Sequence, residues 1–510
     1  MSATWSWCGR LLSEEAVSEL AHGWFQALEA LVRHTAGPGA GGHTSSDLPL
    51  VALSQAEIDR LEAGYPHFEE VLPLSPLQEG LLFHALYDAQ GPDLYTVQLV
   101  LGLEGPLEGE ALRAAAEALL ERHANLRASF VHEGLSRPVQ VIGPEVALPW
   151  REVDLSGLAS AQGEGRLAQW LAQERALRFE LGRGPLVRFS LIRLGEQRHR
   201  LVLTNHHLLL DGWSLPVVVR DLFELYKHRG RSAALGRVTP YRDYLGWLAA
   251  QDRQAAQAAW QRALAGLEEP SRLVDLEPGR AQGGMPEQIS CELSEAQTEA
   301  LSHQARALGL TLNSVLQGAW AILLWKLTGR PEVVFGATVA GRPAELPGSE
   351  TMVGLFINTL PVRVRLRPRE SLGEFFGRLQ HEQAELMAHQ HLSLAEIQGL
   401  AGLGELFDTL VVFENYPVDR SALARPVAGL ELTSVEAHDA THYPLSLTAL
   451  PAGRLSLRLQ YRPDLFERSA VEAMGRRLVA LLEAVVADPS QPIGRLELLE
   501  PEERRQLLVE

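Results

Sequence analysis

The sequence predicts an α/β protein with two lobes, on the basis of three observations. The chain has 510 residues, which is too long for one ordinary domain. Helical and strand patterns alternate from Glu69 onwards without a fixed repeat, which is typical of sheets covered by helices. The stretch 270–286 is rich in glycine and proline, and it separates two halves with the same style of alternation, so we expect an internal linker there.

The composition narrows the class of protein. With 46% hydrophobic and 22% charged residues, the chain can bury a sizeable core, which excludes a disordered or fibrous protein. The formal net charge is −18 and no block of Lys or Arg occurs, so we expect no nucleic-acid partner. No signal peptide and no apolar run of roughly 18 to 20 residues is found, so we expect a cytoplasmic protein without a membrane segment. Cys8 and Cys291 form no metal-binding pattern, and neither a disulfide framework nor a zinc site is predicted.

The first 67 residues have an organisation of their own. We expect a short strand at Thr4–Trp7, a helix over Ser13–His34 and a break rich in glycine and serine at Gly37–Ser46. The strand has no partner nearby, which indicates that 1–67 is the tail of an upstream domain in a longer chain. The segment Gly41–Thr44 superficially resembles a phosphopantetheine attachment loop, but residues before 37 leave no room for the helical bundle that such a loop needs.

Periodicity predicts the elements of the first half in order. A single apolar stripe predicts a helix over Glu108–His123. Strands are expected over Leu186–Leu194 and His199–His206. Ser214 is a suitable N-cap for the next helix, and one long helix is predicted from Pro240 to Leu264.

The second half repeats this style. Helices are predicted over 294–308, 311–328, 370–389 and 467–486, and strands near 333–340, 358–366, 408–414, 430–436, 443–450 and 454–461.

These patterns give a domain organisation. An upstream tail occupies 1–67, the first lobe 68–267, the linker 268–285 and the second lobe 286–490. The charged, helical stretch 491–510 is expected to lead towards a downstream domain.

One segment carries a pattern suited to catalysis, Asn205–Ser214 with the sequence NHHLLLDGWS, between a strand and a helix. A strand-to-helix turn presents side chains at a sheet edge, where sites are usually built. The unperturbed pKa of histidine lies near neutrality, so the paired His206 and His207 suit proton transfer from an amine or hydroxyl. Asp211 can orient a ring or pair with an arginine, and Gly212 lets the backbone turn without a Cβ clash.

A purely structural role is the alternative for this segment: a buried histidine pair satisfied by carbonyls, followed by an acidic residue at a helix N-terminus. The complete string in this setting favours a site. A metal site is disfavoured, because adjacent histidines point to opposite faces of a strand and no third ligand at helical spacing accompanies them.

The chain resembles a condensation domain of a nonribosomal peptide synthetase, over about Pro73 to Ile493. The motifs that carry the resemblance occur in the family's order across both halves. They are Leu72–His84 (LPLSPLQEGLLFH), Arg122–Phe130 (RHANLRASF), Asn205–Ser214, Thr311–Ser314, Gly336–Pro343 (GATVAGRP) and Val353–Pro361 (VGLFINTLP).

The resemblance implies a fold and a set of roles. Two chloramphenicol acetyltransferase-like lobes form a V, with the active site in a tunnel between them. His207 is then the catalytic residue, while His206 and Gly212 are supporting residues. Asp211 is expected to form a salt bridge with an arginine of the second lobe, for which Arg342 is the best match; a surface position in a turn is the alternative for this arginine.

The resemblance also implies a reaction: a donor acyl or peptidyl thioester is transferred to the amine of an L-aminoacyl acceptor, forming an amide. The implied partners are an upstream donor carrier domain and a downstream acceptor carrier domain, with an epimerization domain upstream and an adenylation domain downstream in the natural chain. The carriers hold the 4′-phosphopantetheine arms, so we expect no cofactor and no metal on this chain. His207 would accept or position the amine proton, or hydrogen-bond the tetrahedral species.

Related activities are alternatives. An epimerization domain shares the fold and the HHxxxDG string, but its opening motif usually differs from Ser75–His84. Heterocyclization domains replace the histidines that are intact here, and non-catalytic recruitment domains generally have a degraded motif. A free-standing acyltransferase using coenzyme A is the remaining alternative.

Two features favour a donor that ends in a D residue, as in one branch of the family. One is the opening motif Leu74–His84 together with the segment His389–Gln398. The other is the tail 1–67, which resembles the C-terminal end of an epimerization domain, although Thr44–Ser46 departs from the Thr-Pro-Ser common there.

Overall fold

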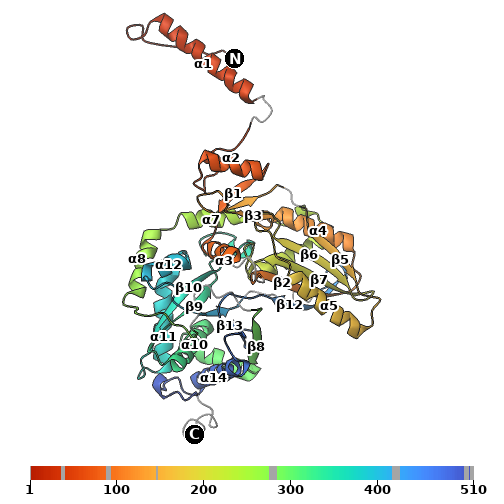
Figure 1. Cartoon of the computed structure of the whole chain (residues 1–510), viewed down its shortest axis with the longest axis vertical. Coiled ribbons are helices and arrows are strands. Elements are labelled where there is room, and N and C mark those ends of the chain that lie inside the picture. Colours follow the sequence, from red (N-terminus) through yellow and green to blue (C-terminus); the bar gives the residue numbers. More distant parts are fainter. Residues whose placement is uncertain are drawn as a thin grey trace.

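The first lobe is built on a five-stranded sheet with the strand order β12-β2-β7-β6-β5 (Figure 1). The computed structural model describes residues 2–35, 41–87, 93–144, 147–274, 284–415, 426–498 and 505. The strands of this sheet are β2 (Thr96–Glu104), β5 (Trp150–Asp154), β6 (Val187–Arg193), β7 (Arg198–His206) and β12 (Glu431–His438).

Helices cover both faces of this sheet, which explains why the central strands β2 and β7 are almost continuously buried. Alternate residues such as Leu101 and Leu203 pack against α4 (Gly109–Arg122) and α6 (Ser214–Lys227). Their neighbours Val100 and Val202 pack against α5 (Ser160–Arg175) on the opposite face. The predicted helix over Glu108–His123 and both predicted strands are confirmed.

The second lobe is built on a six-stranded sheet with the order β10-β9-β11-β13-β14-β8. The strands are β8 (Glu287–Glu292), β9 (Glu332–Val339), β10 (Asn358–Arg365), β11 (Thr409–Phe413), β13 (Leu445–Leu450) and β14 (Ser456–Tyr461). The helices are α9 (Glu295–Ala307), α10 (Leu312–Thr328), α11 (Leu372–Leu386), α12 (Leu394–Ala401) and α14 (Arg468–Ala487). The predicted helices and strands of this half are therefore found, while β8 and α12 were not predicted.

The longest apolar helix of the second lobe shows why the sequence folds this way. In α10, the residues from Ser314 to Leu324 are all buried, as expected for a helix enclosed by a sheet and other helices. The side chain of Thr311 accepts the N–H of Ser314 at 3.0 Å and caps the first turn. Gly329 ends the helix in the left-handed conformation, with a φ of 70°.

Two segments cross between the lobes. β12 follows β11 along the chain but pairs antiparallel with β2, so the second half of the chain supplies an edge strand to the first sheet (Figure 1). In the other direction, α8 (Arg253–Leu264) packs its Trp260 against Val334 and Leu360 of the second sheet. The packing thus crosses the lobe boundaries expected from the sequence at 267 and 286.

The long helix predicted from Pro240 to Leu264 is wrong in one respect, because it is two helices. α7 (Tyr241–Ala249) ends before Asp252, whose carboxylate accepts the N–H of Ala255 at 2.9 Å and caps α8. This N-cap was the available sequence signal for a break. The linker proposed at 268–285 and the connector at 491–510 lie partly outside the described residues, which omit 275–283, 499–504 and 506–510.

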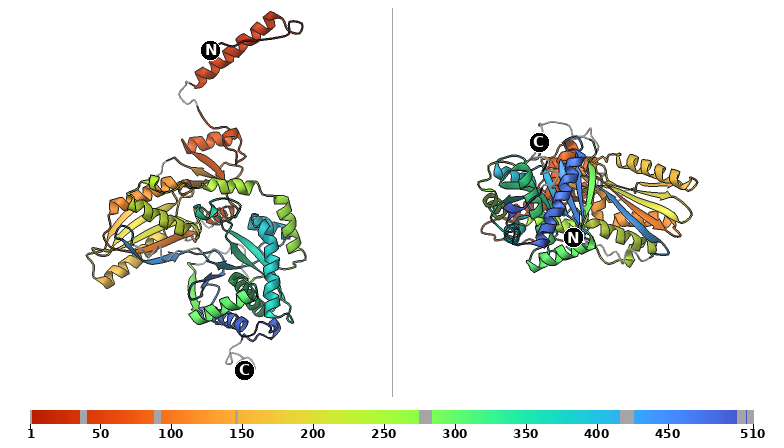
Figure 2. Two further views of the ribbon diagram at one scale, coloured as in Figure 1. Left: turned by 180° about the vertical axis from the view of Figure 1, so that it is seen from behind. Right: turned by 90° about the horizontal axis from the view of Figure 1, so that it is seen from below.

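The N-terminal region contains α1 (Glu14–Thr35), α2 (Gln55–Gly64) and a small sheet ordered β1-β4-β3. Figure 2 shows α1 standing apart from the two lobes. The strands are β1 (Glu70–Pro73), β3 (Ala128–Val131) and β4 (Val139–Ile142), and α3 (Pro76–Tyr87) follows β1. The strand predicted at Thr4–Trp7 is not formed. No strand among the described residues lies beside it to supply hydrogen bonds, and Trp5 packs edge to face on Trp24, with ring centroids 6.0 Å apart.

Within the described ranges, no single helix is both long and apolar enough to cross a membrane. One bent pair, α9 with α10, meets the length and composition test only when its two members are taken together, and they meet at an angle of 100°.

Candidate active site

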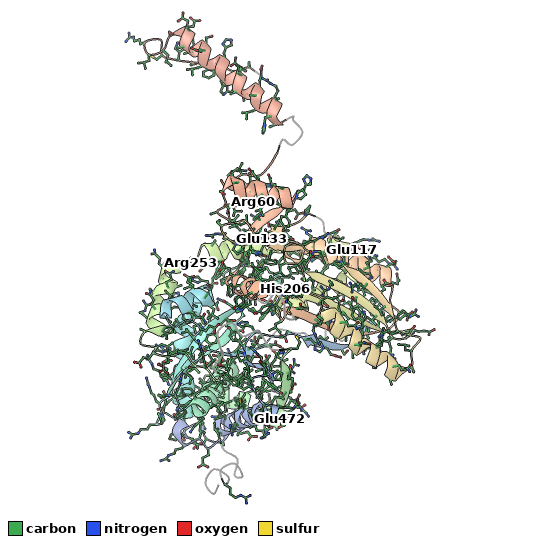
Figure 3. All side chains as sticks on the ribbon, viewed as in Figure 1. Arg60, Glu117, Glu133, His206, Arg253 and Glu472 are labelled. Carbon is green, nitrogen blue, oxygen red and sulfur yellow. The ribbon has the colours of Figure 1, made fainter. Side chains whose placement is uncertain are left out.

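The HHxxxDG string forms the turn between β7 and α6. β7 ends at His206, and α6 begins at Ser214. Figure 3 shows His206 near the centre of the molecule. The string therefore lies at the end of a central strand of the first sheet, as the sequence predicts.

His206 is completely buried and both of its ring nitrogens face polar groups. Nδ1 accepts the N–H of Leu208 at 3.1 Å, and Nε2 lies 3.4 Å from Oδ2 of Asp93. A nitrogen that accepts carries no proton, so the proton of a neutral His206 is on Nε2, facing the carboxylate. Burial raises the pKa of Asp93, but His206 and the N–H of Tyr95 outweigh this effect and the net pKa is lowered.

His207 has a different environment. Its backbone N–H donates to the carbonyl of Tyr95 at 2.8 Å. Among the described residues, Nδ1 of His207 is buried without a hydrogen-bond partner of good geometry. Burial lowers the pKa of His207, and this effect outweighs its own carbonyl, Asp439 and Asp211, which raise the pKa. The lowered pKa favours the neutral ring, which has one N–H donor and one nitrogen that can accept a proton.

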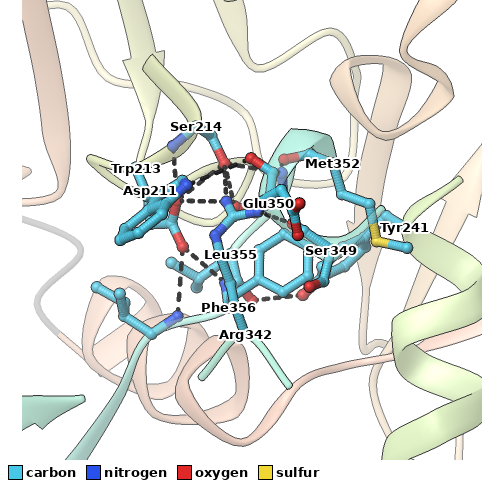
Figure 4. A network of polar contacts seen from close by, with 12 residues as sticks. Asp211, Trp213, Ser214, Tyr241, Arg342, Ser349, Glu350, Met352, Leu355 and Phe356 are labelled. Carbon is cyan, nitrogen blue, oxygen red and sulfur yellow. Dashed lines mark hydrogen bonds and ion pairs between the residues drawn. The ribbon is translucent and has the colours of Figure 1, made fainter. Parts of the chain in front are cut away.

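The Asp211 carboxylate connects this turn to the second half of the chain (Figure 4). Oδ1 accepts the N–H of Ser214 at 2.9 Å and the Arg342 guanidinium at 3.2 Å. Oδ2 accepts the backbone N–H groups of Phe356 at 3.0 Å and Ile357 at 3.4 Å. The predicted ion pair with Arg342 is therefore present, and it is almost fully enclosed, with the two side chains 0% and 5% exposed.

Arg342 is held from several directions and does not have the surface position considered as an alternative. Its guanidinium donates to the carbonyls of Ser349 and Met352. It also lies over the ring of Phe356, 3.9 Å from the centroid. The preceding Gly341 has a φ of 62°, and a Cβ there would lie 1.8 Å from the carbonyl oxygen of Phe356, so the turn requires glycine.

The prediction that Ser214 is the N-cap of α6 is wrong. Ser214 is the first helical residue, and its hydroxyl is buried in the network around Asp211. The hydroxyl lies 2.8 Å from Oδ1 of Asp211 and 2.9 Å from the carbonyl of Gly354, and it accepts from Arg342. Asp211 accepts the N–H of Ser214, one of the N–H groups of the first helical turn that have no partner within the helix. Gly212 lies half-buried in the same turn.

Two buried polar side chains hold the backbone of the turn through hydrogen bonds. Neither of them was assigned from the sequence. Gln78 in α3 donates through Nε2 to the carbonyl of Leu208 at 2.8 Å. Asn125 donates to the carbonyl of Leu209. Both lie inside motifs quoted above, and polar residues within otherwise apolar motifs were the signal that could have identified them. These carbonyls follow His207 directly, so both side chains limit the movement of the turn.

Comparison with known proteins gives the class. The sequence pattern of the family described as "Condensation domain" matches residues 68–508. Linear gramicidin synthase subunits C and B of Brevibacillus parabrevis are 37% and 38% identical to it, each over 100% of this chain. Surfactin synthase subunit 3 of Bacillus subtilis is 31% identical over 86% of the chain. The chain spans only 7%, 10% and 35% of these three relatives.

Solved structures share the fold. The first condensation domain of the calcium-dependent antibiotic synthetase, in complex with a substrate analogue, matches with a TM-score of 0.68 and 23% identity, covering 84% of this chain and 99% of that one. The X-domain in the complex with OxyB from teicoplanin biosynthesis matches with a TM-score of 0.70 and 24% identity, covering 84% and 96%. The predicted chloramphenicol acetyltransferase-like α/β architecture is thus confirmed.

The two-lobed fold and the family match together give the class, an amide-forming acyltransferase. The chain belongs to the condensation-domain family of nonribosomal peptide synthetases, whose general reaction is peptide-bond formation.

The burial of the Asp211–Arg342 pair generates a stability prediction. We expect Asp211→Ala to lower the free energy of unfolding by about 3 to 5 kcal/mol, because it leaves a buried cation unpaired. The loss is measured by urea denaturation. The double variant Asp211→Ala/Arg342→Met, which removes the stranded charge, should recover part of it. As a matched control, Glu117→Ala breaks the exposed pair with Arg113, 3.2 Å long, and should cost less than about 1 kcal/mol. An Asp211→Ala protein as stable as the parent would contradict the prediction.

Proposed function

We propose that this chain joins two carrier-bound thioesters, with His207 as the catalytic residue. The nitrogen of the L-aminoacyl acceptor attacks the thioester carbon of the donor. A C–N bond forms, the C–S bond breaks, and the nitrogen loses a proton while the donor carrier's thiol is released. The observation that carries this proposal is the half-buried imidazole of His207, whose pKa is lowered by burial, directly after a central strand and within the family's HHxxxDG string.

Two roles for His207 are consistent with this environment. A neutral imidazole can accept the proton of the attacking amine, or it can hydrogen-bond the tetrahedral species. The first role requires a ring that is uncharged before reaction, and the lowered pKa supports this. His206 is proposed as a supporting residue, because it is fully buried and its Nδ1 accepts the N–H of Leu208.

Positioning supplies the other part of the proposed catalysis. Holding two reactants end to end replaces a bimolecular encounter with a local one, which contributes much of the rate of such reactions. We propose that the two arms meet in a tunnel between the lobes. The Asp211–Arg342 pair supports this, because it fixes the turn that carries His207 to the opposite lobe.

The proposed partners are an upstream donor carrier and a downstream acceptor carrier, in a chain that also contains an adenylation domain. The much greater length of the related synthases supports such neighbours. An upstream epimerization domain is proposed from the tail. In support, α1 exposes Leu20, Leu31 and Val32 by 57%, 59% and 65%, which gives it an apolar face that the lobes do not cover.

The donor is proposed to end in a D residue. The opening motif on α3 and the segment His389–Gln398 support this, as described above. These two motifs belong to one packed region, because Asn358 donates to the carbonyls of Gln390 and Leu392 at 2.8 and 2.7 Å and α12 contacts α3. Selection between stereoisomers would then come from differential fit in the transition state.

His207→Ala should abolish most dipeptide formation while the protein stays folded, because it removes the imidazole with a small change in packing. The measurement is single-turnover product per mole of folded protein, with both carriers loaded. In the parent, protonation of the ring should reduce the rate only below the ordinary pKa of histidine, since burial lowers the pKa of His207. Full activity of the variant would contradict the assignment. Exchange of the donor Cα proton for solvent deuterium without amide formation would indicate an epimerization domain instead.

The stereochemical proposal is tested by loading the donor carrier separately with D- and L-aminoacyl groups. Dipeptide formation should be faster with the D donor, measured as single-turnover rates at the same acceptor concentration. Loading the acceptor carrier with a D residue serves as the reciprocal control and should slow the reaction. An L donor that reacts as fast as the D donor would end this assignment and leave the condensation reaction untouched.

We propose that the chain itself binds no cofactor or metal. The thioester already carries the activation that amide formation needs, and the reaction transfers no electrons. Dipeptide formation should be unchanged after dialysis against a chelator, measured with freshly loaded carriers. Activity lost on dialysis and restored by a divalent ion would refute the proposal.

A further inference from the structure

A second group of titratable side chains lies beside the HHxxxDG turn and is not used in the function proposed above. His84 lies in the last turn of α3, Tyr95 directly precedes β2, and His442 lies between β12 and β13. The rings of His84 and His442 are stacked, with centroids 4.1 Å apart and an interplanar angle of 24°. Nδ1 of His442 lies 2.8 Å from the hydroxyl of Tyr95. The end of α3 and the start of β2 therefore meet a segment that lies 347 positions beyond Tyr95 in the sequence.

The two stacked imidazoles are uncharged at neutral pH. Burial lowers the pKa of His442 well below its ordinary value, and the adjacent His84 lowers it further. Burial also lowers the pKa of His84, with Glu405 opposing the shift. A neutral imidazole accepts a hydrogen bond through its unprotonated nitrogen, so the Tyr95 hydroxyl can donate to Nδ1 of His442.

Tyr95 connects this group to His207. Its carbonyl accepts the N–H of His207 at 2.8 Å, one residue beyond the ladder in which Thr96 pairs with His206. Among the described residues, no other residue forms a hydrogen bond of good geometry with Nδ1 of His207, and the ring interacts with its own backbone carbonyl. The orientation of the His207 ring therefore depends on the position of its backbone, which the hydrogen bond to the Tyr95 carbonyl holds in place.

We propose that the hydrogen bond between Tyr95 and His442 positions His207, which makes Tyr95 and His442 positioning residues for amide formation. The inference rests on the proposed role of His207. Because His442 follows β12 and precedes β13, it links the sheet of the first lobe to that of the second. The position of the His207 ring thus depends on how β12 is placed against β2. Without the hydrogen bond between Tyr95 and His442, the backbone hydrogen bond from His207 to Tyr95 should open more often. The rate of the chemical step should then fall.

The experiment uses Tyr95→Phe, His442→Ala and the double variant in the full chain, with loaded donor and acceptor carriers. Each single variant should lower the single-turnover rate at saturating carriers by about 3- to 10-fold, the range that follows from losing one hydrogen bond. The double variant should be no slower than the slower single variant, and half-saturating carrier concentrations should not change. His442→Asn keeps an acceptor near the position of Nδ1 and should recover part of the rate.

Hydrogen exchange gives a readout that does not depend on activity. In Tyr95→Phe and His442→Ala, the backbone amide of His207 should exchange faster, while thermal midpoints measured in parallel report any general loss of stability. His438→Ala, at an exposed position on β12, is the matched control and should change neither rate nor exchange. Unchanged exchange at His207 in both variants, or rates equal to that of the parent, would overturn the inference. An active His207→Ala protein would instead refute the proposed function, and the exchange measurement would still decide whether Tyr95 and His442 hold the rung.

Discussion

The buried carboxylate of Asp211 is the interaction on which the geometry of the site depends. It is fully enclosed and receives hydrogen bonds from Ser214, Arg342, Phe356 and Ile357. A carboxylate in such a place is tolerated only when its oxygens are satisfied, so the turn after β7 and the segment before β10 must be together for either to be stable. The ion pair is therefore a specificity device for the assembly of the two lobes more than a source of net stability.

The two adjacent histidines illustrate how neighbouring groups decide the chemistry of a side chain. His206 accepts the N–H of Leu208 through Nδ1, and its Nε2 lies 3.4 Å from the carboxylate of Asp93. His207 is held by its backbone, and its ring nitrogen Nδ1 has no donor or acceptor of good geometry among the described residues. Identical side chains one residue apart thus have different surroundings, because His206 ends β7 and His207 begins the turn that follows it.

Much of the fold and of the site follows from the sequence, because period, caps and motif order are local properties. The ion pair between Asp211 and Arg342 was predictable only through the resemblance, since 131 positions separate its members. The role of Ser214 was misjudged, because an N-cap and a member of a buried network have the same local pattern. The contact of His442 with Tyr95 spans 347 positions and carries no local signal at all. Long-range pairing of β12 with β2 was missed for the same reason.

The placement of β12 has a consequence for how such chains can be recombined. A cut in the glycine- and proline-rich stretch between the lobes would separate β2 from β12. The edge of β2 that pairs with β12 would then have unpaired N–H and C=O groups. The first lobe made alone would have an unpaired sheet edge at which other chains could pair. In a hybrid with a second lobe from another protein, β12 would have to match the register of β2, including the shift between Leu432 and Ser434. Recombination should therefore exchange both lobes together, even though the sequence between them has the composition of an interdomain linker.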